Sequence, residues 1–104
     1  MSDAPHVLIV EARFYEDVAD ELAKGAIAAL AAAGATYERL EVPGAFELPA
    51  AIRMNIKAME LGNGYRYYDG YIALGCVIRG ETSHYDHVCG ECVRGLMDLS
   101  LEFI

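Results

Sequence analysis

The sequence predicts an α/β fold, a three-layer α/β/α sandwich built on a parallel sheet. Three observations lead to this fold class. Short apolar runs alternate with longer stretches of helical periodicity, in the order strand, helix, strand, helix, strand, helix. Elements that alternate in this way indicate parallel strands joined by right-handed crossovers. The chain has 104 residues, 55% of them hydrophobic, which is enough for one core and too little for two ordinary domains.

The first half of the chain is expected to form a strand, a helix and a second strand. Residues 6–10 are branched and apolar, too few for a helix and typical of a strand buried on both faces. Apolar residues then recur every three or four positions, which predicts an amphipathic helix, and Gly34 follows where a left-handed cap is expected. Residues 36–42 alternate in part and stop at a Pro-Gly turn, which predicts the second strand. The apolar stripe of the helix is Val18, Leu22, Ala26, Leu30 and Ala33.

The second half repeats the pattern. Leu48-Pro49 can open a helix, because a proline at the first helical position loses no hydrogen bond, and this helix should end near Gly62. Residues 71–78 are apolar without a charge until their end, which predicts a third, central strand. The remaining residues have helical spacing, and Ser83 with Asp86 resembles a capping box at the helix start. The apolar stripes are Leu48, Ile52, Ile56 and Met59 in one helix and Tyr85, Val88, Cys92, Leu96, Leu99 and Phe103 in the other.

The order of the strands in space predicts where a ligand would bind. With flavodoxin-like winding the order is second, first, third, and ligands of such sheets bind beyond the carboxyl ends of the strands, where the winding direction switches. That rule gathers three loops at one sheet edge, residues 12–14, 43–47 and 79–84. The sequence therefore places its candidate site there.

Composition limits the classes of partner. The formal charge is −8 and the pI about 4.7, which opposes binding to nucleic acid or to an anionic membrane surface. The longest apolar run, residues 26–33, is about half the length of a membrane span. The first residues lack the features of a secretory signal, and the three cysteines are an odd number, which favours reduced thiols in a cytoplasmic protein.

The loop at residues 79–84 has the chemistry of an anion site. It leads from a strand end into a helix start and offers free backbone N–H groups, hydroxyls and one cation. His84 beside it can exchange protons near neutral pH, so the loop suggests chemistry on a phosphorylated small molecule. The alternative is that Ser83 only caps the helix and His84 is a solvated residue of its first turn.

Two further residues face the same predicted edge. Glu47 lies at a helix start, where its carboxylate could accept hydrogen bonds from ligand hydroxyls or only interact with the helix dipole. Phe14 lies off the apolar stripe of its helix and could offer a face to a planar ring, or be an ordinary aromatic at the edge of the core.

Cys89 and Cys92 have the spacing of redox and zinc sites. They also share the apolar stripe of the last helix, and the chain has no second Cys or His pair with suitable spacing. Buried packing is therefore the expected role, and no metal site is predicted.

Three segments resemble one enzyme family, 6,7-dimethyl-8-ribityllumazine synthase of riboflavin biosynthesis. They are VLIVEARF at residues 7–14, VPGAFELP at 42–49 and GCVIRGETSH at 75–84. The third is long and specific, and all three occur in the family's order. The resemblance extends over nearly the whole of the chain, as one domain from residue 1 to 104.

The resemblance implies a transferase without a cofactor, which condenses 5-amino-6-(D-ribitylamino)uracil with 3,4-dihydroxy-2-butanone 4-phosphate and releases phosphate and water. It implies that Phe14 stacks on the pyrimidine and that His84, the catalytic residue, moves protons. The other implied substrate-binding residues are Ala45, Phe46 and Glu47 at the ribityl chain and ring, Cys76, Val77 and Ile78 at the ring through backbone groups, and Glu81 and Thr82 at the phosphate.

The resemblance also implies an assembly. Family members build each site between neighbouring subunits of a pentamer, sometimes within a larger hollow shell. They continue beyond the position of Ile104 with a strand and two helices, which supply a phosphate-binding arginine and an aromatic wall, so this chain is expected to be C-terminally short.

Two other functions stay open at this point. The first is a non-catalytic flavin-binding or shell-assembly module of the same fold, which would bind a flavin-like ring without forming product. The second is a small thiol redox protein, which would depend on Cys92 and not on His84.

Overall fold

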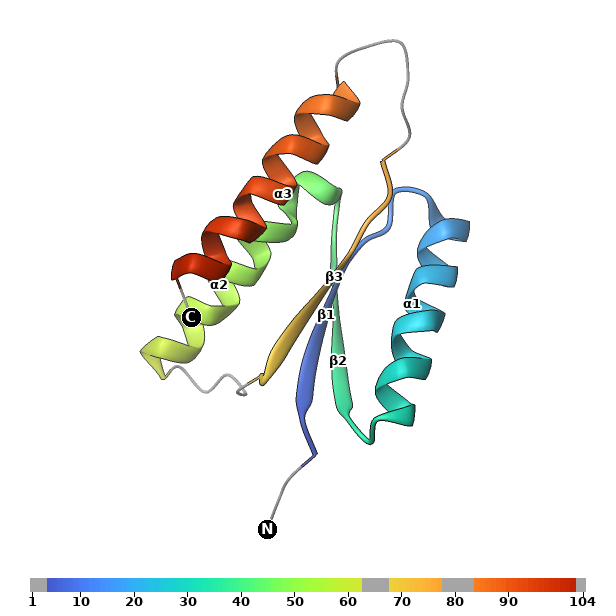
Figure 1. The fold of residues 1–104 in the computed structure, drawn as a ribbon, viewed down its shortest axis with the longest axis vertical. Coiled ribbons are helices and arrows are strands. Elements are labelled where there is room, and N and C mark those ends of the chain that lie inside the picture. The colour runs from blue at the N-terminus through green and yellow to red at the C-terminus, as the bar shows by residue number, and fades with distance from the viewer. Residues whose placement is uncertain (1–3, 63–67, 78–83, 103–104) are drawn as a thin grey trace.

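The computed structural model describes residues 4–62, 68–77 and 84–102, and it has the predicted α/β architecture (Figure 1). Within these residues three strands and three α-helices alternate, and a short 3-10 helix, η1, precedes the second α-helix. No described helix is long and apolar enough to cross a membrane. The elements are β1 (His6–Ala12), α1 (Glu16–Ala32), β2 (Thr36–Val42), η1 (Ala45–Glu47), α2 (Leu48–Leu61), β3 (Gly70–Leu74) and α3 (His84–Glu102).

The strands form a parallel sheet in the order β2-β1-β3, which confirms the predicted winding. β1 is the central strand, and its Ile9 pairs with Arg39 on one side and with Ile72 on the other. β3, which was expected to be central, instead lies at an edge of the described sheet, and its residues are half-buried. Ile9 and Val10 have no exposed surface at all, as expected for a strand that is covered on both faces. All three strands point the same way, so their carboxyl ends meet at one edge of the sheet (Figure 1).

The helices cover both faces of the sheet and complete three layers. Figure 1 shows α1 on one face and α2 with α3 on the other. The main core lies between the sheet and this helix pair, where alternate β1 residues meet the apolar stripes of α2 and α3. Its buried members are Leu8, Val10, Ala12, Val42, Leu48, Ala51, Ile52, Cys92 and Leu99.

The predicted stripes of α2 and α3 are confirmed wherever their side chains are described. Ile56 and Leu96 are half-buried against the core, and the remaining described members are buried. Tyr85 and Phe103 lie outside the described side chains. In α1 the prediction is wrong by part of a turn, because Ala19 and Ala23 are the buried residues whereas Val18 is 41% exposed. Small alanines let this helix approach the sheet closely, and a pattern weighted by side-chain size misses them.

Most element boundaries match the prediction, with two corrections. β1 extends to Ala12, two residues beyond the expected end. β3 ends at Leu74, so residues 75–77 of the expected strand are not in the sheet, while Ile78 lies outside the described residues. β3 pairs with β1 as far as Glu11 and Leu74, and β1 itself ends at Ala12. Soon after Leu74 the third strand therefore has no β1 residues left for backbone hydrogen bonds. Gly34 and Gly62 have the positive φ angles, +73° and +67°, expected after the first two helices.

Candidate functional site

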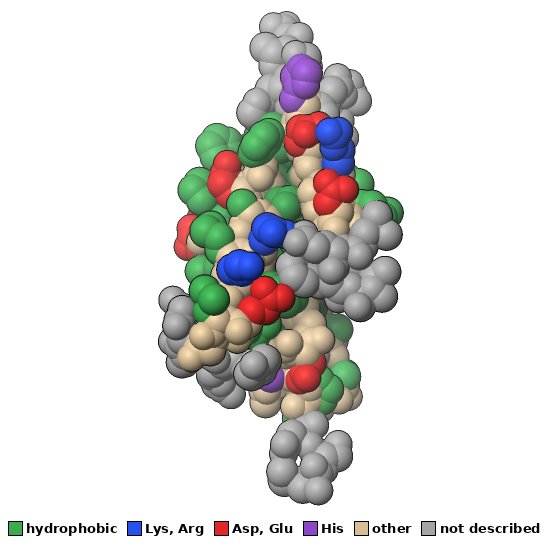
Figure 2. Space-filling model, turned by 90° about the vertical axis from the view of Figure 1, so that its left-hand side faces the viewer, with side chains coloured by type: hydrophobic (Ala, Val, Ile, Leu, Met, Phe, Trp, Pro, Cys, Tyr) green, Lys and Arg blue, Asp and Glu red, His purple; other side chains and the backbone are tan. Residues whose placement is uncertain are grey.

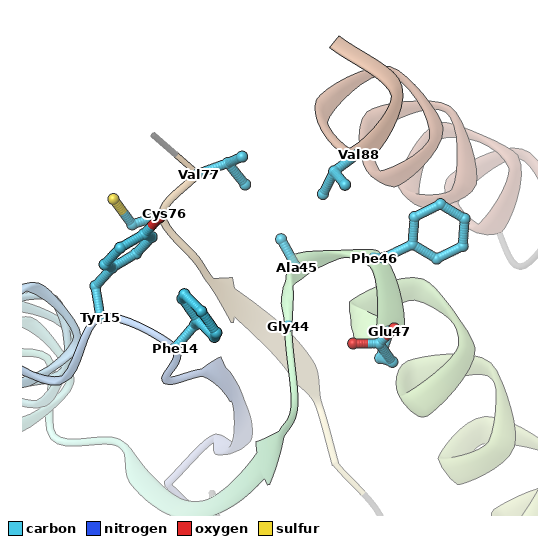
Figure 3. A pocket seen from close by; sticks show the side chains of 9 residues that line it. All are labelled: Phe14, Tyr15, Gly44, Ala45, Phe46, Glu47, Cys76, Val77 and Val88. Atoms are coloured by element: carbon cyan, nitrogen blue, oxygen red, sulfur yellow. The ribbon is translucent and has the colours of Figure 1, made fainter. Parts of the chain in front are cut away.

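A pocket of about 310 Å³ lies at the carboxyl ends of the strands, at the edge that the winding predicts (Figure 3). Each strand contributes the segment that follows it, and α3 contributes one residue of its second turn. Most of the wall is apolar, as is usual for a small-molecule site. The lining residues are Phe14, Tyr15, Gly44, Ala45, Phe46, Glu47, Cys76, Val77 and Val88.

Phe14 and Tyr15 form the aromatic wall, in the loop between β1 and α1. Their rings meet edge to face, with centroids 5.0 Å apart and planes at 84°. Phe14 is 74% exposed, so most of its ring surface is available to a ligand. Figure 3 shows this ring between Tyr15 and the chain at Gly44.

The second wall is the turn after β2 with η1. The N–H of Glu47 donates to the carbonyl of Gly44 at 3.1 Å, which closes this short turn. The Glu47 carboxylate lies so near that turn that a Cβ on Gly44 would be 3.2 Å from its Oε1. Phe46 is 54% exposed and extends from η1 toward α3 (Figure 3). The pocket is therefore lined by the Glu47 carboxylate as well as by the exposed ring of Phe14.

The third wall follows β3. Gly75 packs where the ends of three segments meet, because a Cβ there would be 3.3 Å from Cδ1 of Leu48 and 3.4 Å from Cβ of Ala45. Cys76 and Val77 are half-buried and line the pocket. The lack of a side chain at Gly75 thus lets the third wall lie close to the second.

The structure brings six of the predicted site residues to this pocket: Phe14, Ala45, Phe46, Glu47, Cys76 and Val77. Their roles stay predictions. Ile78, Glu81 and Thr82 lie outside the described residues, as does Ser83 of the expected capping box. His84 is the first residue of α3, and its side chain is outside the described part. Figure 1 shows that α3 begins at the end of the molecule where the strands end.

Three pocket residues were not singled out from the sequence. Gly44 lies within the predicted loop at residues 43–47, although no role was assigned to it, and Tyr15 directly follows the predicted loop at residues 12–14. Val88 was assigned to the apolar stripe of α3, and it is indeed only 7% exposed. Helical periodicity predicts burial but does not show which buried residue also borders a pocket.

The cysteines behave as packing residues where the structure tests them. Cys92 belongs to the core, and burial raises the pKa of its thiol, which disfavours the reactive thiolate. Cys89 and Cys76 are half-buried, and all three thiols are free. Among the described residues, no group of three or more His, Cys, Asp or Glu side chains could hold a metal ion.

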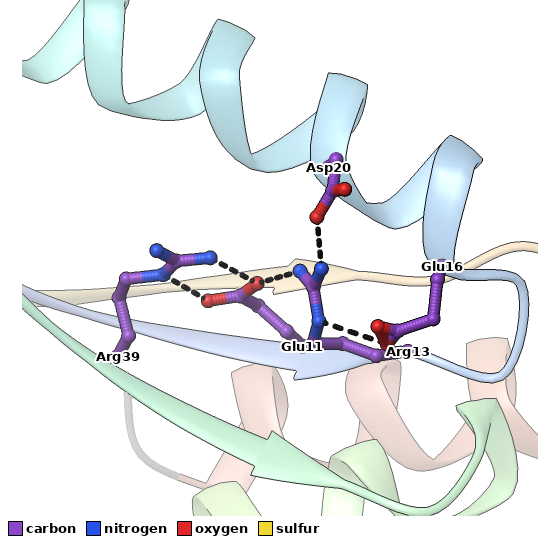
Figure 4. A network of polar contacts seen from close by, with 5 residues as sticks. All are labelled: Glu11, Arg13, Glu16, Asp20 and Arg39. Atoms are coloured by element: carbon purple, nitrogen blue, oxygen red, sulfur yellow. Dashed lines mark hydrogen bonds and ion pairs between the residues drawn. The ribbon is translucent and has the colours of Figure 1, made fainter.

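An ion-pair cluster lies beside the pocket, between the sheet and α1 (Figure 4). Its centre is Glu11 of β1, whose side chain is only 3% exposed. Nε and Nη2 of Arg39 donate to the two Glu11 oxygens at 2.6 Å and 2.8 Å, and Nη1 of Arg13 donates to Oε1 at 2.8 Å. Arg13 also binds Asp20, and its Nε lies 3.4 Å from Oε1 of Glu16. We call these five residues the Glu11 cluster.

The cluster keeps its buried carboxylate ionised. The hydrogen bonds from Arg39, and then those from Arg13, lower the pKa of Glu11 although burial alone would raise it. In return, hydrogen bonds to Asp20 and Glu11 raise the pKa of Arg13. The sequence did not reveal this cluster, because its members are spread over two strands, a loop and a helix.

Comparison with known proteins identifies the family of the chain. The family model described as 6,7-dimethyl-8-ribityllumazine synthase matches residues 4–103. Curated proteins of that name are similar: 53% identity over 97 residues in Paramagnetospirillum magneticum, 57% over 97 in Agrobacterium fabrum and 57% over 95 in a Methylobacterium species.

These matches cover 93%, 93% and 91% of this chain, respectively, and 65%, 64% and 51% of the three relatives. The chain thus spans between half and two thirds of the length of the curated relatives that it matches. The family match extends over nearly all of its residues, so the chain belongs to the 6,7-dimethyl-8-ribityllumazine synthase family.

Proposed function

We propose that the chain condenses 5-amino-6-(D-ribitylamino)uracil with 3,4-dihydroxy-2-butanone 4-phosphate to give 6,7-dimethyl-8-ribityllumazine, phosphate and water, without a cofactor. One observation carries the proposal beyond family membership. The pocket is lined by both the exposed Phe14 ring and Glu47, on either side of the chain at Gly44 (Figure 3), at the edge of the sheet where this winding binds ligands. An aromatic face and a carboxylate suit a flat ring that carries a hydroxylated chain.

In this reaction an amino group of the pyrimidine attacks the ketone and loses water to form an imine. The C–O bond to phosphate then breaks, and the ribityl-bearing nitrogen closes the second ring with loss of water. The contribution of the pocket is mainly to hold the two substrates in the orientation for attack. Phe14 stacks on the pyrimidine and Glu47 accepts hydrogen bonds from ribityl hydroxyls.

The remaining contacts are proposed from the sequence. Cys76, Val77 and Ile78 offer backbone groups to the edge of the ring. Glu81 and Thr82 hold the phosphate in the loop before α3, where the positive end of the helix dipole favours an anion. His84, the first residue of that helix, accepts and returns the protons that the amine and leaving groups exchange.

We also propose a cytoplasmic homo-oligomer, a pentamer or an assembly of pentamers. Exposed apolar side chains on η1, α2 and α3 support an interface, since a monomer gains nothing from exposing them. On the side of the molecule that α2 and α3 form, Figure 2 shows hydrophobic side chains among the acidic ones. Those more than half exposed are Phe46 at 54%, Met54 at 67%, Leu61 at 64%, Val93 at 65% and Met97 at 57%.

The test is an absorbance assay for lumazine formation from the two substrates, after the size of the chain in solution has been measured. The proposal predicts product, and a rate that falls roughly ten- to a thousandfold in His84→Ala, the range expected for losing one proton-transfer group that water can partly replace. An unchanged rate would remove His84 from the mechanism. A folded oligomer that binds riboflavin but forms no product would replace the enzyme by the flavin-binding module.

The phosphate assignment has its own test. Thr82→Val deletes a hydroxyl that faces the anion and keeps the shape of the side chain. KM for the butanone phosphate should therefore rise more than KM for the pyrimidine. Equal changes in the two KM values would reject the assignment of Thr82 to the phosphate.

A further inference from the structure

The aromatic wall of the pocket, formed by Phe14 and Tyr15, is part of a short loop. Residues 13–15 connect β1 to α1, and the Phe14 ring is 74% exposed. Its described ring contact is with Tyr15, the next residue of the same loop. Tyr15 is the N-cap of α1 and makes no capping hydrogen bond with its side chain. The direction of the Phe14 ring therefore depends on how the loop backbone is held.

Arg13 supplies that support from the residue immediately before Phe14. Its guanidinium contacts carboxylates on two different elements, Glu11 of β1 and both Glu16 and Asp20 of α1 (Figure 4). The Arg13 side chain is only 13% exposed. A planar guanidinium that contacts several carboxylates is fixed in orientation as well as in position. The two ends of the loop are thereby tied together.

We propose that Arg13 is a positioning residue, which sets the face of Phe14 for the planar ring of the substrate through its bonds to Glu11 and Asp20. The inference rests on the proposed function for the identity of that ring. Arg13 does not line the pocket, so its effect on a ligand passes through the loop. Binding to a wall that is already in place avoids the entropy of ordering it.

Arg39 provides a matched control. It also forms hydrogen bonds to the buried Glu11 carboxylate, at 2.6 Å and 2.8 Å, so Arg39→Gln disturbs the same cluster. However, Arg39 lies on β2, where it pairs with Ile9 of β1, far along the chain from the loop. A role limited to stability predicts similar effects for Arg39→Gln and Arg13→Gln, whereas a positioning role predicts different ones.

The first experiment observes the loop without any ligand. The nuclear Overhauser effect between the Phe14 and Tyr15 rings is measured by NMR in the folded wild type, Arg13→Gln and Arg39→Gln. The contact should weaken strongly in Arg13→Gln and persist in Arg39→Gln. A contact of equal strength in Arg13→Gln and wild type would overturn the proposal. This readout needs neither binding nor turnover, so it stands even if the proposed function fails.

The second experiment measures binding of riboflavin, a planar ring with a ribityl chain, by quenching of its fluorescence. Arg13→Gln should raise Kd about tenfold, since misplacement of a binding group by a fraction of an ångström has effects of this order. Arg39→Gln should stay within about twofold, and Arg13→Lys, which keeps one charge, should lie between. In a Phe14→Ala background Arg13→Gln should change Kd less than about twofold, because coupled residues are not additive.

The outcomes separate the two hypotheses. A tenfold loss that persists in the Phe14→Ala background would overturn the positioning role, because Arg13 would then act on the ligand by another route. Equal losses in Arg13→Gln and Arg39→Gln would assign the whole cluster to stability. Absence of riboflavin binding in the wild type would count against the flavin-binding module, and the ring contact would then decide the role of Arg13.

Discussion

Gly95 of α3 lies against Pro49 of α2 so closely that a Cβ on Gly95 would be 2.8 Å from both Cβ and Cγ of the proline ring. Real contacts of this kind are longer, so nothing larger than glycine fits without movement. The contact is formed one helix turn from Leu99, a buried member of the core. The absence of a side chain at Gly95 therefore allows α2 and α3 to pack at this distance over the sheet.

Replacing this glycine should separate the two helices. Gly95→Ala is expected to lower the free energy of unfolding by about 1–3 kcal/mol, the usual effect of overpacking. Urea denaturation measures it. Gly90→Ala in the same helix is the control, because a Cβ there meets nothing within 4 Å and should stabilise the chain by up to about 1 kcal/mol. Equal effects at both positions would show that helix propensity, and not the contact with Pro49, decides the result.

The Glu11 cluster should make stability depend on pH at the acid end. The pKa of Glu11 is lowered in the folded chain from its ordinary value of 4.5. Its contribution is therefore complete above about pH 4.5 and is lost as the pH falls through the lowered pKa. At pH 7, Glu11→Gln should cost about 2 kcal/mol, the scale of hydrogen bonds to charged groups. The difference from the wild type should shrink toward zero in acid.

The free energy of unfolding of the wild type and of Glu11→Gln is measured by urea denaturation at several pH values between neutrality and the acid transition. Glu60→Gln is the control, since the Glu60 carboxylate is half exposed and 3.9 Å from Nζ of Lys57. Exposed pairs contribute little, so this variant should match the wild type throughout. A Glu11→Gln difference that stays constant with pH would disprove the role assigned to ionised Glu11.

Truncating Phe14 should separate binding from stability. The side chain is 74% exposed, so Phe14→Ala should change the free energy of unfolding by no more than about 0.5 kcal/mol. Stacking on a base contributes about 1–3 kcal/mol, so affinity for the proposed pyrimidine substrate should fall roughly ten- to a hundredfold. Calorimetry measures the affinity. Tyr37→Ala, on β2 and outside the pocket, should leave it unchanged, and equal losses in the two variants would refute the stacking role.

The thiols should differ in reactivity. Burial raises the pKa of Cys92, whereas Cys76 and Cys89 are half-buried. An aromatic disulfide reagent at pH 8 should modify Cys92 last, and urea should remove the difference. Variants with one cysteine replaced by serine identify which kinetic phase of the reaction belongs to which thiol. Rapid modification of Cys92 in the folded chain would revive the thiol redox function, which its place in the core opposes.

The sequence was sufficient for the elements, their order in the sheet and the edge that carries the pocket. Periodicity identifies the stripes of α2 and α3 because large side chains dominate there. It misplaces the stripe of α1, where Ala19 and Ala23 make the close contacts. The end of β3 at Leu74 depends on where its partner strand β1 ends. The sequence of residues 71–78 alone carries no information about that.

The candidate site, too, was predicted from the sequence only in part. Phe14 and Glu47 were found through topology and resemblance, since each follows a strand, whereas Cys76, inside the expected third strand, was found through the resemblance alone. Arg13 was not, although it precedes Phe14 directly. Its role depends on carboxylates at Glu11 and Asp20 that become neighbours only in the folded chain. Interactions between elements of this kind cannot be deduced from spacing.

The three walls of the pocket come from three strand ends separated by about thirty residues of chain each. No fragment of the polypeptide contains the site, and the unfolded chain retains none of it. A ligand of this pocket must therefore stabilise the whole fold, by about 2.7 kcal/mol at a hundredfold excess over Kd. Thermal shift can thus report occupancy of this pocket, with no need for a chromophore or for turnover.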